Sequence, residues 1–482
     1  MSKNIWETDG GVYFGYQCAA PPDIDQPLAG EWTPRAEMHR YTGDRHLVTL
    51  GPNGSGKTRR LLVPNLAMLI NWSILVVDPK GELAVQTAAH RKAEGSEIIT
   101  LDPFGVIERQ YPGLVEKLPY LKSAGLNPIA ALDPDSEDFP DDAKAIGEAL
   151  IKIDSKGESY WAKSAQSLIA GLVMGLRLKF GPSADFGTLR DVIGSEATQL
   201  AAFIQSKILP DLPEAHAAIA AKLNRFTKIS SDNKELMSII STAQTQTDWL
   251  DSRPIQNDLA RGEPIDFGKM KDRPVTVYLI LPPRYLETHA TWLRLMITAV
   301  LTPLIRTTGG KVPVLFMLDE FAQLGHLEVI ERNMALMRGY GVKLWPVFQD
   351  LAQAQDVYEK RWESFISNAG VLQSFAPQDV TTRDYLSKLS GQKLYWLKTT
   401  GTSSGQNMGP QSSINSGVTE GWQNIQGPVY WPQALAAMQD GQAVLFAKGK
   451  APRSWLPDPS KMDATKTMLL VAETEARQGR AA

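Results

Sequence analysis

Short apolar segments alternate with amphipathic ones through much of this chain. Strands that are apolar on both alternations are typical of a parallel sheet covered by helices on each face. Helical spacing intervenes, most clearly over 287–306 and 326–338. The pattern predicts an α/β fold with a doubly wound, mostly parallel sheet. Its strands are expected at 46–50, 73–78, 97–102, 275–281, 314–319, 342–349, 371–376 and 443–447.

The strand signal disappears between residues 140 and 262. Apolar residues there recur at helical spacing, and alanine is frequent. We expect an all-α domain over 140–262, inserted into an α/β domain that comprises 43–139 and 263–455. No catalytic cluster stands out in the insertion, which favours a binding or gating role. The four helical segments are 142–153, 160–176, 197–208 and 213–226.

Three further segments lack either period. Residues 1–42 are rich in Gly, Pro and aromatic residues, and we expect an irregular N-terminal lead-in. Residues 399–427 are biased to Ser, Gly, Asn and Gln, with too few apolar groups to offset the entropy of ordering, so we expect a flexible loop. Residues 456–482 are expected to form a C-terminal tail, helical or disordered.

The composition is that of a soluble globular protein. Of 482 residues, 43% are hydrophobic and 21% charged, and the net charge is −3. Because there is no basic bias, any contact with DNA must come from a local patch. Cys18 is the only cysteine, which excludes an internal disulfide and suits a reducing compartment. With no signal peptide and no apolar segment of spanning length, we expect a cytoplasmic protein.

Residues 51–58 read G-P-N-G-S-G-K-T, between a predicted strand and a helix-prone stretch. In this context the glycines let backbone N–H groups converge on phosphate oxygens, and the helix N-terminus adds partial positive charge. Lys57 is expected to reach the β- and γ-phosphates of ATP, and the Thr58 hydroxyl to bind Mg²⁺. A chance Gly-rich turn is the alternative. The predicted phosphate cradle consists of Gly51, Pro52, Asn53, Gly54, Ser55, Gly56, Lys57 and Thr58.

An acid pair ends the apolar run 314–319. Asp319 is placed to hold Mg²⁺, directly or through water. Glu320 is placed to polarise the attacking water, a general-base role worth roughly 10² to 10⁴ in rate. Two exposed acids at a strand end would look the same. Beside the P-loop, however, the pair predicts hydrolysis of ATP.

Two more polar residues are candidates for the hydrolysis site. Gln349 ends the next predicted strand, and strands of a parallel sheet end at one edge, so its amide could reach the γ-phosphate or the water. Arg338 follows the intervening helix and is suited to reach a neighbouring subunit's γ-phosphate. A backbone-bonded glutamine and a solvated surface arginine are the open alternatives. In V-V-D-P-K-G-E (76–82), Asp78, Lys80 and Glu82 could rim the site, although a plain charged turn would look similar.

One misleading similarity is excluded by spacing. L-S-G-Q-K at 389–393 is similar to the signature of ABC transporter ATPases. In that family the signature shortly precedes the acid pair, whereas here it follows by about seventy residues. The gap of roughly 260 residues between P-loop and acid pair is also too long for that family.

The ordered motifs resemble the type IV secretion coupling proteins, the TraG/TraD-like conjugative DNA-transfer ATPases related to the FtsK/HerA motors. The resemblance covers about 45–390. Two of its motifs, D-P-K-G-E and the one around the acid pair, are far more specific than the P-loop alone. The matching motifs include D-P-K-G-E (78–82), T-A-A-H-R (87–91), L-N-P-I (126–129), L-D-E-F-A-Q-L-G (318–325), R-G-Y-G (338–341) and D-V-T-T-R-D-Y-L-S (379–387).

The resemblance implies a RecA-like motor domain carrying an all-α domain that selects cargo. It implies six subunits around a channel, with a monomer in the absence of DNA as the alternative. ATP hydrolysis would drive DNA with its relaxase, or an effector protein, to a type IV secretion channel. By match to the family's motifs, Asp319 and Glu320 form the Walker B pair, Gln349 is the downstream glutamine and Arg338 the intersubunit finger.

Members of this family usually begin with transmembrane helices, and this chain has none. We therefore expect it to be peripheral at the inner membrane through partners, or to act with a membrane part on another chain. Two other functions stay open: a soluble cargo adaptor that uses ATP as an assembly switch, and a plasmid- or defence-associated DNA translocase or helicase.

Overall fold

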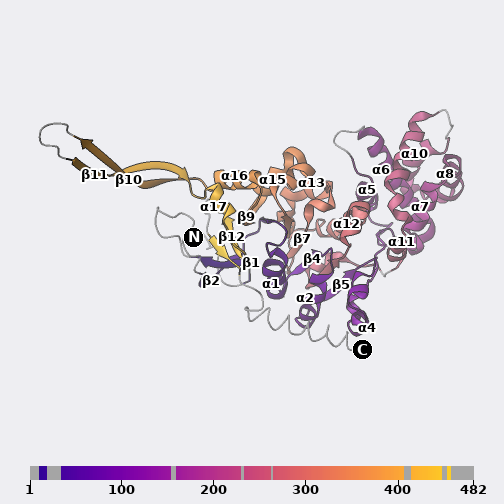
Figure 1. Cartoon of the computed structure of the whole chain (residues 1–482). Helices are drawn as coiled ribbons and strands as arrows, with labels where there is room; N and C mark the ends of the chain where they lie inside the picture. Colours follow the sequence, from indigo (N-terminus) through magenta and orange to yellow (C-terminus); the bar gives the residue numbers. More distant parts are fainter. Residues whose placement is uncertain are drawn as a thin grey trace. The chain divides into compact units, whose positions relative to one another are not determined.

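Figure 1 shows a computed structural model of the chain. The structure describes residues 10–18, 34–153, 159–228, 233–261, 264–406, 414–447 and 453–456. The chain divides into two compact units. The first comprises Met1–Gly43, Leu47–Leu61 and Phe348–Asp458, and the second comprises Asp44–His46, Leu62–Val347 and Pro459–Ala482.

The second unit contains parallel strands in the order β8-β7-β4-β6-β5. Every residue of β4, β6, β7 and β8 is buried, because apolar side chains occupy both faces of these strands. The predicted parallel sheet is therefore confirmed, with strand ends shifted by one or two residues. The strands are β4 (Ser73–Val77), β5 (Glu97–Leu101), β6 (Val275–Leu279), β7 (Val314–Leu318) and β8 (Val342–Phe348).

Helices alternate with these strands, as the sequence predicts. A buried arginine of α2 fastens two of the elements: Arg91 is fully buried and donates to the carbonyls of Leu66, Leu69 and Trp72 and to the Thr276 hydroxyl on β6. It thereby satisfies carbonyls that the end of α1 leaves without helical partners. The helices are α1 (Val63–Met68), α2 (Glu82–Ala93), α3 (Val106–Gln110), α4 (Leu114–Lys117), α12 (Pro283–Leu304) and α13 (Glu328–Met337).

Between residues 139 and 260 the described residues form helices and no strand. The long helix α6 is the centre of this group, and α5, α9 and α10 pack on it. A Cβ at Gly147 of α5 would lie 2.6 Å from the Gln166 carbonyl of α6, so only glycine allows this close approach. The limits 140 and 262 of the inserted domain stay a prediction. The helices are α5 (Phe139–Leu150), α6 (Ser159–Phe180), α7 (Phe186–Gly194), α8 (Ala197–Phe203), α9 (Ala217–Leu223), α10 (Lys234–Gln246) and α11 (Arg253–Ala260).

The first unit has strands in the order β2-β1-β13-β12-β9-β3. Neighbouring strands from β2 to β9 pair antiparallel. The strands predicted at 46–50, 371–376 and 443–447 are confirmed here. The elements are β1 (Val12–Cys18), β2 (Pro34–Tyr41), β3 (His46–Leu50), β9 (Ala369–Phe375), β12 (Gln442–Phe446) and β13 (Arg453–Trp455), with helices α14 (Leu351–Tyr358), α15 (Trp362–Asn368), α16 (Val380–Leu389) and α17 (Pro432–Ala436).

The prediction of an irregular segment over 1–42 is wrong for its described part. Strands β1 and β2 lie there, and Val12, Tyr13 and Phe14 are fully buried. Strand β1 pairs with β13, with Tyr16 opposite Trp455. Because this partner is more than four hundred residues away in the sequence, no local pattern reveals the pairing.

The prediction of a flexible loop over 399–427 is also wrong for the described residues. Strands β10 (Gln392–Gln406) and β11 (Ile414–Pro428) form an antiparallel ribbon, paired from Gln392↔Pro428 to Gln406↔Ile414. The ladder of backbone hydrogen bonds orders a segment whose composition is poor in apolar residues. Residues 407–413 and the predicted tail, apart from Leu456, lie outside the described residues. In the part of the chain that the structure describes, no helix combines the length and the apolar character that crossing a membrane requires.

Candidate nucleotide-binding and hydrolysis site

The P-loop follows β3 in the first unit. The Gly51 amide donates to the Phe348 carbonyl (3.0 Å), which fixes the start of the loop. Gly54 and Gly56 have φ values of 79° and 84°, which L side chains rarely adopt. The amide of Arg60 donates to the Gly56 carbonyl (2.7 Å), so the helical turn η1 (Thr58–Leu62) begins directly at the loop. The local geometry is that expected of a phosphate cradle.

The side chain of Lys57 turns into this loop. It is only 6% exposed, and its Nζ donates to the carbonyls of Gly51 (2.5 Å) and Pro52 (3.0 Å). A Cβ at Gly51 would lie 3.0 Å from Ser55 Oγ and 3.1 Å from Lys57 Cδ, so this position has little room for a side chain. The loop thus presents one buried ammonium group to whatever it encloses, which suits a polyanion.

Gln349 directly follows the carbonyl that anchors the P-loop. Its amide donates to Gln353 Oε1 (3.2 Å), and Asp350 caps α14 by accepting from the Gln353 amide (2.9 Å). Within the first unit the structure therefore brings Gln349 to the start of the loop, next to Phe348. Gln353 was not singled out by sequence reasoning, although it lies within the matched motif text.

The acid pair follows β7 in the second unit. Asp319 is 8% exposed, and Glu320 has a φ of 51°, a left-handed conformation that few non-glycine residues adopt. The Glu320 amide donates to Asp319 Oδ1 (3.0 Å), and Gln323 Nε2 donates to Glu320 Oε2 (3.1 Å). The turn thus orients both carboxylates, with Gln323 as a positioning residue that sequence reasoning missed.

Asp78 lies deeper than predicted. It follows β4, whose last residue Val77 pairs with Leu318 of β7. Its carboxylate is buried and accepts from the Ala84 amide at the start of α2 (2.8 Å). Burial raises the pKa of Asp78 to about 7, the bond from Ala84 opposes this, and the nearby Asp319 carboxylate adds to it. Asp78 therefore lies within the protein near Asp319, instead of forming an exposed rim.

Arg338 begins the short turn η11 (Arg338–Tyr340) after α13. Half of its side chain is exposed, and its Nε lies 3.5 Å from Asp44 Oδ2. Exposed ion pairs of this kind contribute about 0–1 kcal/mol, so the guanidinium can exchange Asp44 for another anion at little cost. Its role as an intersubunit finger stays a prediction.

A buried histidine fixes the elements around Arg338. His46 Nε2 donates to the Met334 carbonyl on α13 (2.5 Å), and His46 Nδ1 accepts from the Leu344 amide on β8 (3.0 Å). Burial lowers the pKa of His46, chiefly, while the bond to Met334 opposes the change. The neutral ring therefore holds α13 against β8.

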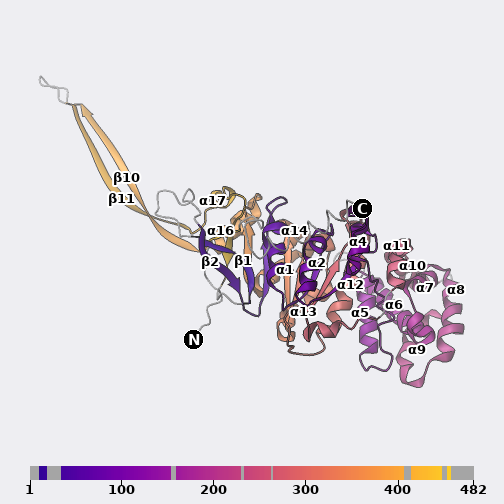
Figure 2. The ribbon, with the colours of Figure 1, turned by 90° about the horizontal axis from the view of Figure 1, so that it is seen from below.

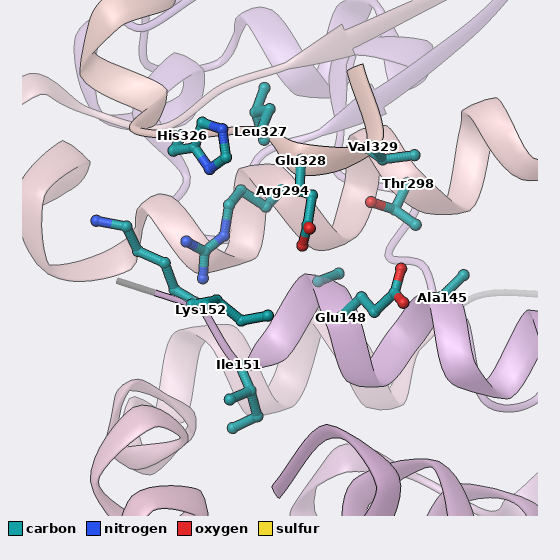
Figure 3. A pocket seen from close by; sticks show the side chains of 12 residues that line it. Ala145, Glu148, Ile151, Lys152, Arg294, Thr298, His326, Leu327, Glu328 and Val329 are labelled. Atoms are coloured by element: carbon teal, nitrogen blue, oxygen red, sulfur yellow. The ribbon is translucent and has the colours of Figure 1, made fainter. Parts of the chain in front are cut away.

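The segment after the acid pair reaches the inserted helices. A pocket of about 40 Å³ lies where His326 and Leu327 meet α12 and the end of α5. Figure 3 shows Arg294 and His326 on one side of it and Lys152 and Glu148 on the other. His326 Nε2 is also bonded to the Glu331 carboxylate. A continuous set of contacts thus leads from Glu320 through η10 (Phe321–Leu324) to α5.

Comparisons with known proteins agree with the motifs. The model of the family described as "Type IV secretory system Conjugative DNA transfer" matches residues 20–455. A conjugal transfer protein TraG of Escherichia coli is 25% identical over 452 residues, covering 87% of this chain and 66% of that protein. Protein VirD4 of Agrobacterium fabrum (strain C58 / ATCC 33970) is 25% identical over 415 residues, covering 84% and 57%. The chain thus spans less than two thirds of the length of these relatives.

Solved structures share the fold. The plasmid coupling protein TrwB in complex with ADP and Mg²⁺ superposes with a TM-score of 0.60 at 15% identity, covering 94% of this chain and 96% of that one. TrwB with the ATP analogue ADPNP gives a TM-score of 0.59 at 15% identity, with the same coverage. The predicted RecA-like fold is thereby confirmed. Since the family model matches nine tenths of its length, this chain belongs to the type IV secretory system conjugative DNA transfer family, the coupling proteins that its motifs resemble.

Proposed function

We propose that this chain is an ATP-hydrolysing coupling protein. It recruits DNA with its relaxase, or an effector protein, and drives this cargo to a type IV secretion channel. The observation that carries the proposal is a complete P-loop with a buried lysine in a chain of the conjugative DNA transfer family. The relatives TraG and VirD4 and the solved TrwB structures support it.

The donors of the P-loop fit ATP. Lys57 exchanges the carbonyls of Gly51 and Pro52 for the β- and γ-phosphates, which are stronger acceptors. The loop amides supply further donors. We propose the Thr58 hydroxyl and the Asp319 carboxylate as ligands of Mg²⁺, since hard oxygen donors are what this ion prefers. Bound Mg²⁺ would neutralise charge on the phosphate oxygens.

Glu320 is the proposed general base. Its carboxylate accepts a proton from the attacking water, while the bond between the γ-phosphorus and its bridging oxygen breaks and ADP leaves. Gln349 orients the water or the γ-phosphate through its amide. Arg338 of a neighbouring copy stabilises the charge that develops, consistent with its exposure and its weak ion pair with Asp44.

The assembly we propose is a homo-oligomer, a hexamer by family resemblance, with the inserted helices selecting the cargo. The contacts from Glu320 through η10 to the pocket beside α5 are a physical route by which hydrolysis could be sensed there. Whether the cargo is DNA or protein follows from the experiment below.

The test is the rate of ATP hydrolysis by the purified full chain with and without single- and double-stranded DNA. We expect turnover above roughly 1 s⁻¹ when cargo DNA is added. Lys57→Ala should reduce hydrolysis to background, whereas Lys80→Ala, at an exposed lysine, should leave it unchanged. Hydrolysis by Lys57→Ala at the wild-type rate would overturn the proposal. ATP binding without turnover would instead favour the adaptor.

A further inference from the structure

The ribbon β10–β11 carries an apolar stripe on one face. Cross-strand partners share a face, and alternate residues of one strand do so too. Leu394 and Trp396 are alternate residues of β10, while Trp422 lies opposite Lys398 and Val418 opposite Thr402. All four apolar side chains therefore lie on the same face. They are 61%, 50%, 64% and 64% exposed for Leu394, Trp396, Val418 and Trp422.

The ribbon is anchored only at its base. Tyr395, on the opposite face, is buried, and its hydroxyl donates to the Pro428 carbonyl (2.6 Å). Its ring lies 6.2 Å from that of Trp431, and a Cβ at Gly427 would lie 2.4 Å from the Trp431 ring. Among the described elements of the first unit, β10 and β11 pack extensively only on each other. Figures 1 and 2 show the ribbon projecting beyond the other elements of this unit.

A free two-stranded ribbon with two exposed tryptophans is marginally stable in water. Both of its outer edges carry backbone N–H and C=O groups that could pair with another strand, and proteins usually protect such edges with charged residues. Of the thirty residues in β10 and β11, only Lys393, Lys398 and Glu420 are charged. The edges are therefore open to strand addition.

The charge and the position of the stripe narrow the occupant. Two lysines over this length are too few for a surface that binds the phosphates of DNA. Insertion into lipid would require apolar side chains at the far end, but the strands there read T-S-S-G-Q (402–406) and I-N-S-G (414–417). A flank that combines open edges with an apolar stripe fits a second β-strand.

The area agrees with a protein interface. Fifteen residues per strand make a ribbon about 50 Å long and roughly 10 Å wide, so one face offers on the order of 500 Å². The face together with one edge approaches the roughly 800 Å² per partner that stable interfaces bury. An identical ribbon supplies the same open edges and a matching stripe.

We propose that the β10–β11 ribbon is a self-association surface, on which an edge pairs with the ribbon of a second copy of this chain and the stripe becomes covered. The inference deepens the proposed assembly of the chain and rests on it. It requires no change at the P-loop or the acid pair.

The test measures self-association of the full chain by mass photometry across a range of concentrations, with ADPNP and Mg²⁺. Trp396→Thr combined with Trp422→Thr should weaken association at least tenfold. Phe180→Thr, which removes an exposed aromatic residue of α6, should not. Circular dichroism and binding of the nucleotide should be unchanged in the double variant, which distinguishes loss of the surface from misfolding.

Cross-linking gives a second readout. In a Cys18→Ser background, Thr400→Cys should form disulfide-linked dimers on oxidation, whereas Phe180→Cys should not. A double variant that associates like the wild type, or a wild-type chain that stays monomeric while hydrolysing ATP, would overturn the ribbon proposal and leave the proposed ATPase intact. Loss of hydrolysis control by Lys57 would instead defeat the proposed function alone.

Discussion

At the scale of single residues, backbone conformation prepares the candidate chemistry. Gly54 and Gly56 take positive φ values because no Cβ opposes them, and this lets the loop amides converge. Glu320 takes a similar φ of 51° despite its side chain. Non-glycine residues in this region carry strain of order 1–3 kcal/mol, which persists where the surroundings fix the residue. Its bonds to Asp319 and Gln323 supply that support.

Glu320→Gln should separate binding from hydrolysis. The amide keeps the shape and can still bond to Gln323, but it cannot accept a proton, so turnover should fall by roughly 10²- to 10⁴-fold. Affinity for ATP should change little, because the P-loop is intact. Steady-state hydrolysis and equilibrium binding of a fluorescent ATP analogue measure the two quantities. Glu287→Gln, at an exposed glutamate of α12, is the control, and wild-type turnover in Glu320→Gln would exclude the general-base role.

At the scale of elements, buried polar side chains fasten helices to strands. Arg91 joins α2 to the end of α1 and to β6 through four acceptors. Desolvation lowers the pKa of this guanidinium to about 10, so it stays protonated at neutral pH. Since α1 follows directly on the P-loop turn, this clamp also fixes where the loop's helix ends.

Arg91→Met should therefore destabilise the fold. The methionine fills much of the space but leaves three carbonyls and a hydroxyl without their donor, at a cost of about 3 kcal/mol or more. Urea denaturation followed by circular dichroism measures the change. Arg109→Met, at an exposed arginine, should shift stability by less than about 0.5 kcal/mol. Equal midpoints for the two variants would show that the four hydrogen bonds contribute little.

At the scale of the whole molecule, stability should depend on pH through His46. The folded state holds this ring neutral, with a pKa below its usual value of 6.5. The unfolded chain binds a proton as pH falls below about 6.5 while the folded chain does not, so stability falls toward acid by up to about 1.4 kcal/mol per pH unit. The loss continues until the pH reaches the lowered pKa of the folded state.

His46→Asn should flatten this dependence. The Asn oxygen can accept from the Leu344 amide as Nδ1 does, but the side chain does not titrate. Denaturant unfolding at pH 7.5 and 5.5 should show a loss smaller by about 1 kcal/mol in the variant. His216→Asn, at a half-exposed histidine, is the comparison. If wild type and His46→Asn lose the same stability on acidification, His46 is not the group that responds.

The sequence by itself determined the elements whose signals are local. The P-loop, the acid pair and the strands of the parallel sheet are contiguous patterns, because glycines, a lysine or an apolar run carry their information within a few residues. The helical character of the described residues between 139 and 260 was visible for the same reason.

Only the tertiary structure decided what depends on distant partners. Strand β1 is buried because β13 and β2 cover its edges, and Asp78 is buried because α2 folds over it. Arg91 and His46 look like ordinary polar residues until their carbonyl and amide partners gather around them. The ribbon was misread because its order comes from cross-strand hydrogen bonds, which composition does not encode. Local pattern fixes an element's type, whereas burial and pairing arise from contacts that the folded chain alone creates.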